Sequence, residues 1–208
     1  DYENHFKENR YKDFTQEKAD SLTRSLYIVS KDTTTIFLKT PRPNIVFIIM
    51  ESWTAYGVSS FGGDNFAPFI DSLSKQGIRF TKLYPAGYVS DQGIPAILSG
   101  YPCTSRISVI NQSSKSAKLP CINIDLKKYG YESGFVFGGD LNYGNIRSYI
   151  CNEKFDVVKE ERDFESTVPR GKLGLQDGDM EKEYVKTLNE AKHPFVYVGF
   201  TLSSHMPF

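Results

Sequence analysis

Asn44-Ile-Val-Phe-Ile-Ile-Met50 is the stretch of sequence that decides the fold. It is continuously apolar and rich in β-branched residues, and it lies between Pro43 and the charged residue Glu51. Such a run is typical of a strand that is buried on both faces, because helices cover both faces of a parallel sheet. The stretch therefore predicts a central strand of an α/β domain.

Strand and helix patterns alternate along the rest of the chain. Expected helices cover residues 68–76, 90–99, 122–129 and 179–192, and expected strands cover residues 78–84, 133–137 and 195–202. This alternation predicts an α/β fold with a mostly parallel sheet flanked by helices on both faces. Ligands of such folds bind outside the carboxyl ends of the strands, so the residues that follow each strand are the candidates for a site.

The first 40 residues differ in composition from the rest of the chain. They are polar, and two prolines, Pro41 and Pro43, follow them. A weak helical pattern runs through Ala19, Leu22, Leu26 and Val29. We interpret residues 1–40 as a partly helical leader or linker and residues 41–208 as the α/β domain.

The overall composition is that of a folded domain. The 208 residues include 25 basic and 25 acidic side chains, and 39% are hydrophobic. The chain has no basic tail, which argues against a nucleic-acid partner. The longest strongly apolar run, residues 45–50, is far shorter than the roughly 20 residues of a membrane helix. We therefore expect the chain itself to be soluble, and any membrane contact to come from a segment outside it.

The three cysteines, Cys103, Cys121 and Cys151, allow at most one internal disulfide bond. Cys103 and Cys121 flank a loop rich in Ser and Lys, and a bridge between them would stabilise that loop in an oxidising compartment. The alternative is three buried free thiols. Zinc-binding patterns such as Cys-x-x-Cys are absent from the sequence.

Charged side chains follow three of the expected strands. Glu51 follows the first strand, Asp140 follows the strand over 133–137, and His205 follows the last strand. A carboxylate placed directly after six apolar residues is costly to bury unpaired, so a cation or the mouth of a pocket would be its natural partner. The alternative is a Glu51 that caps a neighbouring helix or faces solvent.

Ser90 lies at an expected strand-to-helix junction. Free backbone N–H groups and the helix dipole favour negative charge there, so a serine alkoxide or a bound phosphoryl group would be stabilised. The alternative is an ordinary serine N-cap, which is common at such positions.

A cluster of polar residues follows the paired glycines Gly138-Gly139. It runs from Asp140 to Arg147 and includes Asn145. The guanidinium of Arg147 suits bidentate binding of phosphate oxygens. The alternative is an ordered turn in which Asp140 and Arg147 pair only with each other.

Four motifs taken together resemble those of the lipoteichoic acid synthase and phosphoglycerol transferase family, a branch of the alkaline phosphatase and sulfatase superfamily. In chain order they are Pro43-Asn-Ile-Val-Phe-Ile-Ile-Met-Glu51-Ser, Ser90-Asp-Gln-Gly-Ile-Pro-Ala-Ile-Leu-Ser-Gly-Tyr-Pro102, Gly138-Gly-Asp-Leu-Asn-Tyr-Gly-Asn-Ile-Arg147 and Thr201-Leu-Ser-Ser-His205-Met-Pro-Phe208. The resemblance implies an alkaline phosphatase-like fold, of which residues 41–208 form the N-terminal portion of the catalytic domain, incomplete at the C-terminus.

The resemblance also implies roles for single residues. Glu51 stands where the family has a ligand of one divalent metal ion, and Ser90 stands at the position of the nucleophile, usually Thr, which also touches the metal. Asp140, Arg147 and His205 resemble the residues that hold the phosphoglycerol head group of the substrate. Asn145, in the same substrate pocket, falls where Gram-positive members tend to have Trp, which leaves the preferred head group open.

One expected motif is missing. The family completes its metal site with an Asp-His pair followed by Gly, and no Asp-His pair occurs in this sequence. The resemblance therefore implies a polypeptide that binds its metal ion (Mn, Mg, Zn or Ca) weakly or not at all and is inactive alone.

For the intact enzyme, the resemblance implies attack of Ser90 on a phospholipid head group. A phosphoseryl intermediate would form, and a phosphoglycerol-type group would pass to a cell-envelope glycan or polyglycerol acceptor. The expected location is the extracytoplasmic face of the bacterial membrane, with N-terminal anchoring helices outside this chain.

Three alternatives remain. One is a phosphoethanolamine transferase, and another is a non-catalytic domain that binds phosphate esters. The third is a sulfatase-fold hydrolase, although Gln92 and Ile94 occupy the positions where sulfatases carry Pro or Ala and Arg.

Overall fold

The computed structural model describes residues 13–26, 28, 36–103 and 107–206. The chain divides into two compact units, residues 1–41 and residues 42–208. The first unit contains helix α1 (Gln16–Leu26), none of whose residues is buried. This helix confirms the helical pattern predicted through Leu22 and Leu26, whereas Val29 lies outside the described residues.

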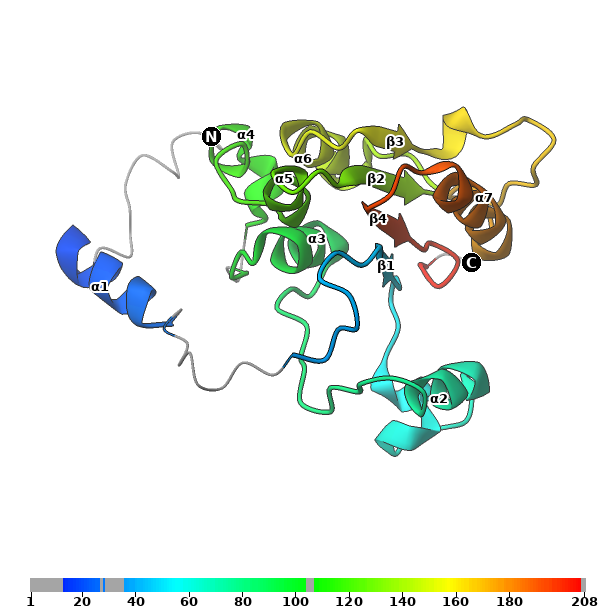
Figure 1. Cartoon of the computed structure of the whole chain (residues 1–208), viewed down its shortest axis with the longest axis horizontal. Helices are drawn as coiled ribbons and strands as arrows, with labels where there is room; N and C mark the ends of the chain where they lie inside the picture. Colours follow the sequence, from blue (N-terminus) through cyan, green and yellow to red (C-terminus); the bar gives the residue numbers. More distant parts are fainter. Residues whose placement is uncertain (1–12, 27, 29–35, 104–106, 207–208) are drawn as a thin grey trace. The chain divides into compact units, whose positions relative to one another are not determined.

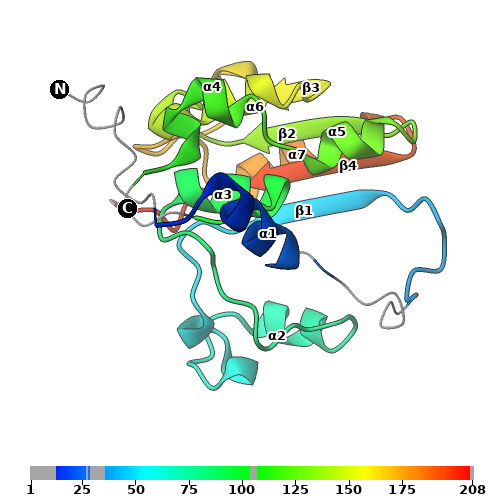
Figure 2. The same cartoon turned by 90° about the vertical axis from the view of Figure 1, so that its left-hand side faces the viewer.

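The second unit is built on a sheet of four parallel strands in the order β1-β4-β2-β3 (Figure 1). The strands are β1 (Ile45–Ile49), β2 (Glu132–Phe137), β3 (Val157–Lys159) and β4 (Phe195–Phe200). Figure 2 shows them side by side in this order. The predicted parallel sheet is confirmed, and β1, β2 and β4 lie where strands are expected, whereas β3 was not predicted.

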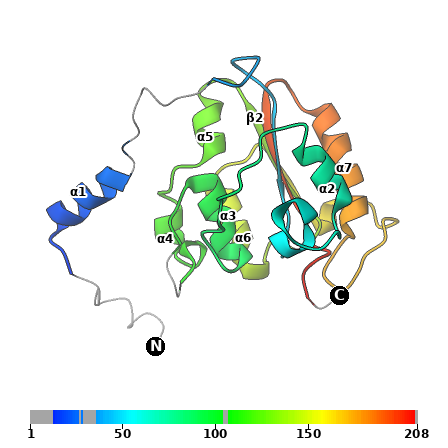
Figure 3. The ribbon, with the colours of Figure 1, turned by 90° about the horizontal axis from the view of Figure 1, so that it is seen from below.

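Helices cover both faces of the sheet, as predicted (Figure 3). On one face α3 (Ser90–Ser99), α5 (Ile122–Lys127) and α6 (Ile146–Asn152) pack around Phe135 and Val198. On the other face α7 (Asp177–Glu190) packs on Val136 and Tyr197 through Met180. Two further helices, α2 (Pro68–Ser74) and α4 (Ser113–Ser116), lie in connecting segments. Neither α4 nor α6 was predicted from the sequence.

Strand β1 is less buried than its sequence predicts. It pairs with β4 on one side only. Val46 and Ile48 are 45% and 58% exposed, whereas Phe47 and Ile49 pack against the core. The expectation of burial on both faces is therefore wrong for the described part of the chain, because an edge strand whose one face is uncovered exposes alternate side chains.

The strand predicted over residues 78–84 is wrong. This segment forms no strand, and Ile78 and Phe80 are 61% and 68% exposed. Its apolar pattern is that of a strand, but a strand also needs a neighbouring backbone to take its hydrogen bonds. Within the described residues, no strand lies beside this segment to supply them.

No disulfide bond joins any of the described cysteines, so the proposed bridge between Cys103 and Cys121 is wrong. The alternative of three buried thiols is also wrong, since Cys151 is exposed. Cys121 is buried, with its Sγ 3.8 Å from the hydroxyl of Tyr149. Burial raises the pKa of the Cys121 thiol to about 11.

As far as the structure describes the chain, no helix is long and apolar enough to cross a membrane.

Candidate active site

Glu51 lies at the carboxyl edge of the sheet, two residues after the end of β1. Its backbone N–H donates to the Thr201 hydroxyl at 2.9 Å, and the N–H of Thr201 donates to the carbonyl of Ile49 at 3.0 Å. These bonds tie the ends of β1 and β4 together. The next residue, Ser52, has a left-handed φ of 56° and donates its hydroxyl to Glu51 Oε1 at 3.0 Å. A non-glycine residue in this conformation is strained, and such strain is common at functional sites.

Ser90 is the first residue of α3, and the N-cap position is occupied by Val89. No side chain caps this helix, so the common role of a serine N-cap does not apply to Ser90. Its side chain is half-buried. Ser90 therefore lies in the first turn of α3, where the helix dipole favours negative charge.

Asp91, the next residue, was not recognised from the sequence. Burial raises the pKa of its carboxyl, and its Oδ1 is buried with no hydrogen-bond partner among the described residues. A methyl group built on Gly144 would lie 3.7 Å from Asp91 Cβ. This proximity brings the start of α3 beside the loop that follows β2.

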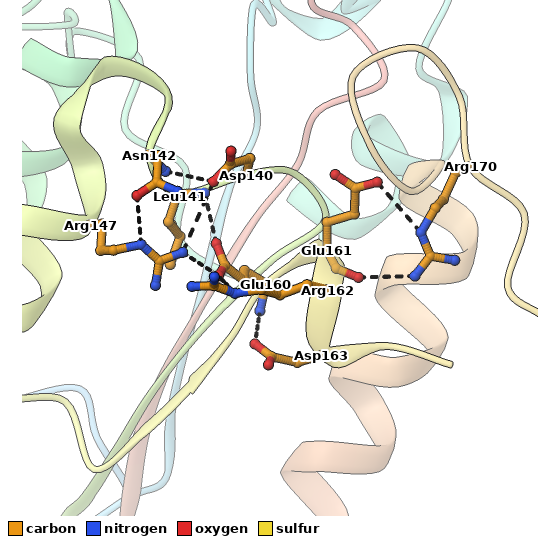
Figure 4. Close-up of polar contacts among 9 residues, drawn as sticks. All are labelled: Asp140, Leu141, Asn142, Arg147, Glu160, Glu161, Arg162, Asp163 and Arg170. Carbon is orange, nitrogen blue, oxygen red and sulfur yellow. Dashed lines mark hydrogen bonds and ion pairs between the residues drawn. The ribbon is translucent and has the colours of Figure 1, made fainter. Parts of the chain in front are cut away.

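The loop after β2 is an ordered turn, but Asp140 and Arg147 are not its main pair. Asp140 Oδ1 accepts a hydrogen bond from the N–H of Asn142 at 2.8 Å, and Arg147 Nη2 lies 4.0 Å from the same oxygen. Arg147 instead donates from Nε to Asn142 Oδ1 at 2.8 Å and from Nη2 to Glu160 Oε1. Figure 4 shows this chain of contacts. The predicted alternative of an isolated Asp140–Arg147 pair is therefore wrong.

Glu160 is the partner that the sequence analysis missed. It follows β3, its side chain is 3% exposed, and it also pairs with Arg162. The bond to Glu160 raises the pKa of Arg147, which keeps this guanidinium charged. Glu160 belongs to a run of charged residues, which is typical of a solvated surface, and this explains why its burial was not expected.

Asn145 turns the chain into α6. Its φ is 60°, and its side-chain amide donates to the carbonyl of Ile110 at 2.9 Å. This bond uses one of the two donors of the amide, and among the described residues the side-chain oxygen accepts no hydrogen bond.

His205 lies against the same loop. Its ring meets the ring of Tyr143 edge-on, with 6.1 Å between the centroids. The backbone before it is held by Asp177, whose Oδ1 accepts hydrogen bonds from the N–H groups of Leu202 and Ser203 at 2.6 and 3.0 Å. A pocket of about 100 Å³ lies between His205 and residues 171–176.

These contacts bring the predicted residues to one edge of the sheet. Thr201 connects Glu51 to the segment of His205, Tyr143 connects His205 to the loop of Arg147, and Gly144 lies beside the start of α3. They do not assemble a complete metal site. Across residues 13–26, 28, 36–103 and 107–206, no group of three or more His, Cys, Asp and Glu side chains is placed to hold a metal ion. The Glu51 carboxylate and the Ser90 hydroxyl alone are fewer donors than zinc or calcium takes.

Solved structures share this fold. An alkaline phosphatase superfamily protein from Vibrio parahaemolyticus has a TM-score of 0.74 and 31% sequence identity, covering 82% of this chain and 42% of that chain. The lipoteichoic acid synthase LtaP from Listeria monocytogenes has a TM-score of 0.68 and 17% identity, covering 79% of this chain and 41% of that one. Both likenesses agree with the predicted alkaline phosphatase-like fold.

Sequence comparison identifies the family. Phosphoglycerol transferase I of Xanthomonas campestris is 27% identical over 182 residues, covering 80% of this chain and 26% of that protein. The chain thus spans about a quarter of the length of the curated relatives it matches. The family model described as Sulfatase matches residues 43–208, which is most of the chain. The chain therefore belongs to the sulfatase family of the alkaline phosphatase superfamily, and its relatives are enzymes.

Proposed function

We propose that the whole protein transfers a phosphoglycerol-type head group from a phospholipid to a cell-envelope glycan or polyglycerol acceptor, with Ser90 as the nucleophile. The observation that carries this proposal is the placement of Ser90. Ser90 is the first residue of α3, and its hydroxyl does not act as an N-cap. The start of that helix lies beside the loop of Arg147. The likeness to a phosphoglycerol transferase supports the choice of head group.

In the first step, Ser90 Oγ forms a bond to the phosphorus atom. The bond between phosphorus and the diacylglycerol oxygen breaks, and that oxygen takes up the proton lost by Ser90. In the second step, an acceptor hydroxyl attacks the phosphoserine, its proton returns to Ser90 Oγ, and the head group is transferred. The free N–H groups at the start of α3 would stabilise the charge on the phosphoryl oxygens in both steps.

The remaining predicted residues bind the head group in this proposal. Arg147 would bind the non-bridging phosphoryl oxygens, because a charged guanidinium presents paired donors to an oxyanion. Asp140 lies in the same loop as Tyr143, whose ring meets that of His205, and the side chains of Asp140 and His205 suit the hydroxyl groups of a glycerol unit. Asn145 adds an amide oxygen to the same loop.

One structure with this fold, the periplasmic domain of EcEptC from Escherichia coli, is a complex with Zn. We propose that Glu51 and Ser90 supply two ligands of a divalent ion, which would act as a Lewis acid toward the phosphoryl group. These two donors do not fill the coordination shell of such an ion. The proposed location is the extracytoplasmic face of the bacterial membrane, where phospholipid head groups and envelope glycans are both accessible.

The test is a Ser90→Ala variant of the full-length enzyme, assayed with radiolabelled phosphatidylglycerol. We expect turnover to fall by at least about 100-fold, as is usual when a nucleophile is lost. The Ser90→Thr variant is the matched control, since it keeps a hydroxyl and should retain activity. Mass spectrometry of the quenched wild-type enzyme should find glycerophosphate on Ser90. Normal turnover of the alanine variant would refute the assignment, and labelling from phosphatidylethanolamine alone would change the head group.

A further inference from the structure

Glu160 is a carboxylate buried at the carboxyl end of β3. It directly follows Lys159, the last residue of that strand, and its side chain is 3% exposed. Oε2 accepts a hydrogen bond from the backbone N–H of Leu141 at 2.9 Å. Oε1 pairs with both Arg147 and Arg162. A buried carboxylate needs such partners, so all three contacts contribute to stabilising this side chain inside the protein.

These contacts constrain both parts of the loop that we propose binds the substrate. The bond to Leu141 fixes the backbone between Asp140 and Asn142, whose own turn is closed by the Asp140 carboxylate. The bond to Arg147 fixes the guanidinium at the far end of the same loop. The Glu160 carboxylate therefore holds both the Asp140–Asn142 turn and the Arg147 guanidinium in position.

The way Arg147 is bound leaves a defined edge for a ligand. Nε donates to Asn142 Oδ1, and one N–H of Nη2 donates to Glu160, so the side edge of the guanidinium is occupied. Within the residues that the structure describes, Nη1 has no acceptor, and the side chain is 30% exposed. A guanidinium has five N–H donors in a fixed plane, so the end edge can still present paired donors to two phosphoryl oxygens.

The exposed part of Arg147 remains accessible to an anion. The carboxylate of Glu160 neutralises one of the two guanidiniums that contact it, and Arg162 is 65% exposed on the solvent side. Asp140 is 59% exposed and 4.0 Å from Arg147, so this solvent-exposed ion pair is weak. Glu160 is thus sufficient to orient Arg147 without cancelling the charge that a phosphate would need.

We infer that Glu160 is a positioning residue that holds Arg147 and the Asp140–Asn142 turn in the orientation that binds the phosphoryl group. This inference rests on the proposed function, because it takes Arg147 as the phosphate-binding residue. Glu160 itself does not contact the substrate, and its effect on binding passes through Arg147.

A double-mutant cycle tests the inference. The inhibition constant of glycerol 1-phosphate is measured for the full-length enzyme and for Glu160→Gln, Arg147→Met and the double variant. We expect each single variant to weaken inhibition about 10-fold, since each removes a charge-assisted contact. The inhibition constant of the double variant should lie within about 2-fold of the inhibition constant of Arg147→Met. The inference is overturned if the two single effects on the inhibition constant multiply in the double variant. It is also overturned if Arg147→Met weakens inhibition and Glu160→Gln does not.

Glu161→Gln is the matched control. Glu161 lies in the same loop and makes the same kind of pair, with its Oε1 3.4 Å from Arg170 Nε, but it does not contact Arg147. We expect this variant to bind glycerol 1-phosphate within about 2-fold of the wild type. If Glu161→Gln weakens inhibition as much as Glu160→Gln does, the effect is a general one of the loop and the inference fails.

An NMR measurement on the 208-residue chain separates this inference from the proposed function. The Nε–H resonance of Arg147 should shift or broaden in Glu160→Gln and remain unchanged in Glu161→Gln. An unchanged resonance in Glu160→Gln overturns the positioning role, whatever the inhibition data show. If instead Arg147→Met leaves inhibition unchanged, the substrate assignment of the proposed function fails and the role of Glu160 in binding fails with it.

Glu160→Gln could unfold the loop, because it removes a buried charge that three groups contact. Glu160→Asp is therefore made in parallel, and thermal melting checks that it folds. It keeps the charge but is one methylene shorter, so it should still shift the Arg147 resonance and weaken inhibition. Wild-type behaviour of Glu160→Asp in both measurements would count against the inference.

Discussion

Glu153 is a buried acid for which the structure supplies no ionic partner, and replacing it should change how stability depends on pH. It follows α6 and is 1% exposed, and its Oε1 has no hydrogen-bond partner among the described residues. The titratable groups around it are Cys121, whose own pKa is raised, and Tyr149. Burial raises the pKa of Glu153 to about 7 from the ordinary 4.5.

The direction of the pH effect depends on whether the folded or the unfolded chain keeps Glu153 protonated. Between pH 4.5 and pH 7 the folded chain keeps Glu153 protonated and the unfolded chain does not, so the free energy of unfolding falls as the pH rises through this window. The difference between the two pKa values corresponds to at most about 3 kcal/mol. Above pH 7 both states are ionised and the loss is complete.

The Glu153→Gln variant removes this titration and keeps the shape of the side chain. We expect it to unfold with a free energy up to about 3 kcal/mol higher than the wild type at pH 8, with a smaller difference at pH 5. Urea unfolding followed by circular dichroism from pH 5 to pH 8 measures both values. Glu181→Gln is the matched control, because Glu181 is exposed on α7. If the free energies of unfolding of Glu153→Gln and the wild type change with pH in the same way, the reasoning is refuted.

Two further substitutions test the packing of the sheet and the support of the histidine segment. An alanine Cβ at Gly134 would lie 2.1 Å from the Tyr197 ring, so Gly134→Ala should lower the free energy of unfolding by about 1–3 kcal/mol in urea. Gly178→Ala, where nothing lies within 4 Å, should not lower it, and equal losses would argue against the clash. Asp177→Ala removes the acceptor of the two N–H groups at residues 202–203 and should speed their hydrogen exchange about 10-fold. Unchanged exchange at these two amides would show that the carboxylate does not hold the segment.

The parallel sheet was predictable because β1 and β4 are apolar runs and β2 ends in three apolar residues, 135–137. Strands β1, β2 and β4 all lie where such runs predict them. Residues 78–84 have a similar pattern but form no strand, because a strand depends on a neighbouring backbone as well as on its own side chains. The same dependence explains the exposure of Val46 and Ile48, since only tertiary structure decides which face of a strand is covered.

Most of the candidate site residues were predicted from one rule, which takes the residues that follow recognised strands. Glu51, Asp140 and His205 were each chosen because they follow a strand. The strand-end position alone could not show that Arg147 would be bound by something other than Asp140. That partner comes from a part of the sheet that the sequence pattern did not reveal.

The rule did not select Glu160, because β3 is too short to be recognised from the sequence. The strand has three residues, Val157–Lys159, which is too short for periodicity to separate it from a loop. Had this strand been recognised, the rule that selected Glu51 and Asp140 would have selected Glu160 as well, because it directly follows the strand. The missed residue therefore does not contradict the principle that sites form at the carboxyl ends of parallel strands. Glu160 extends the principle to a side chain that contacts Arg147 rather than the substrate.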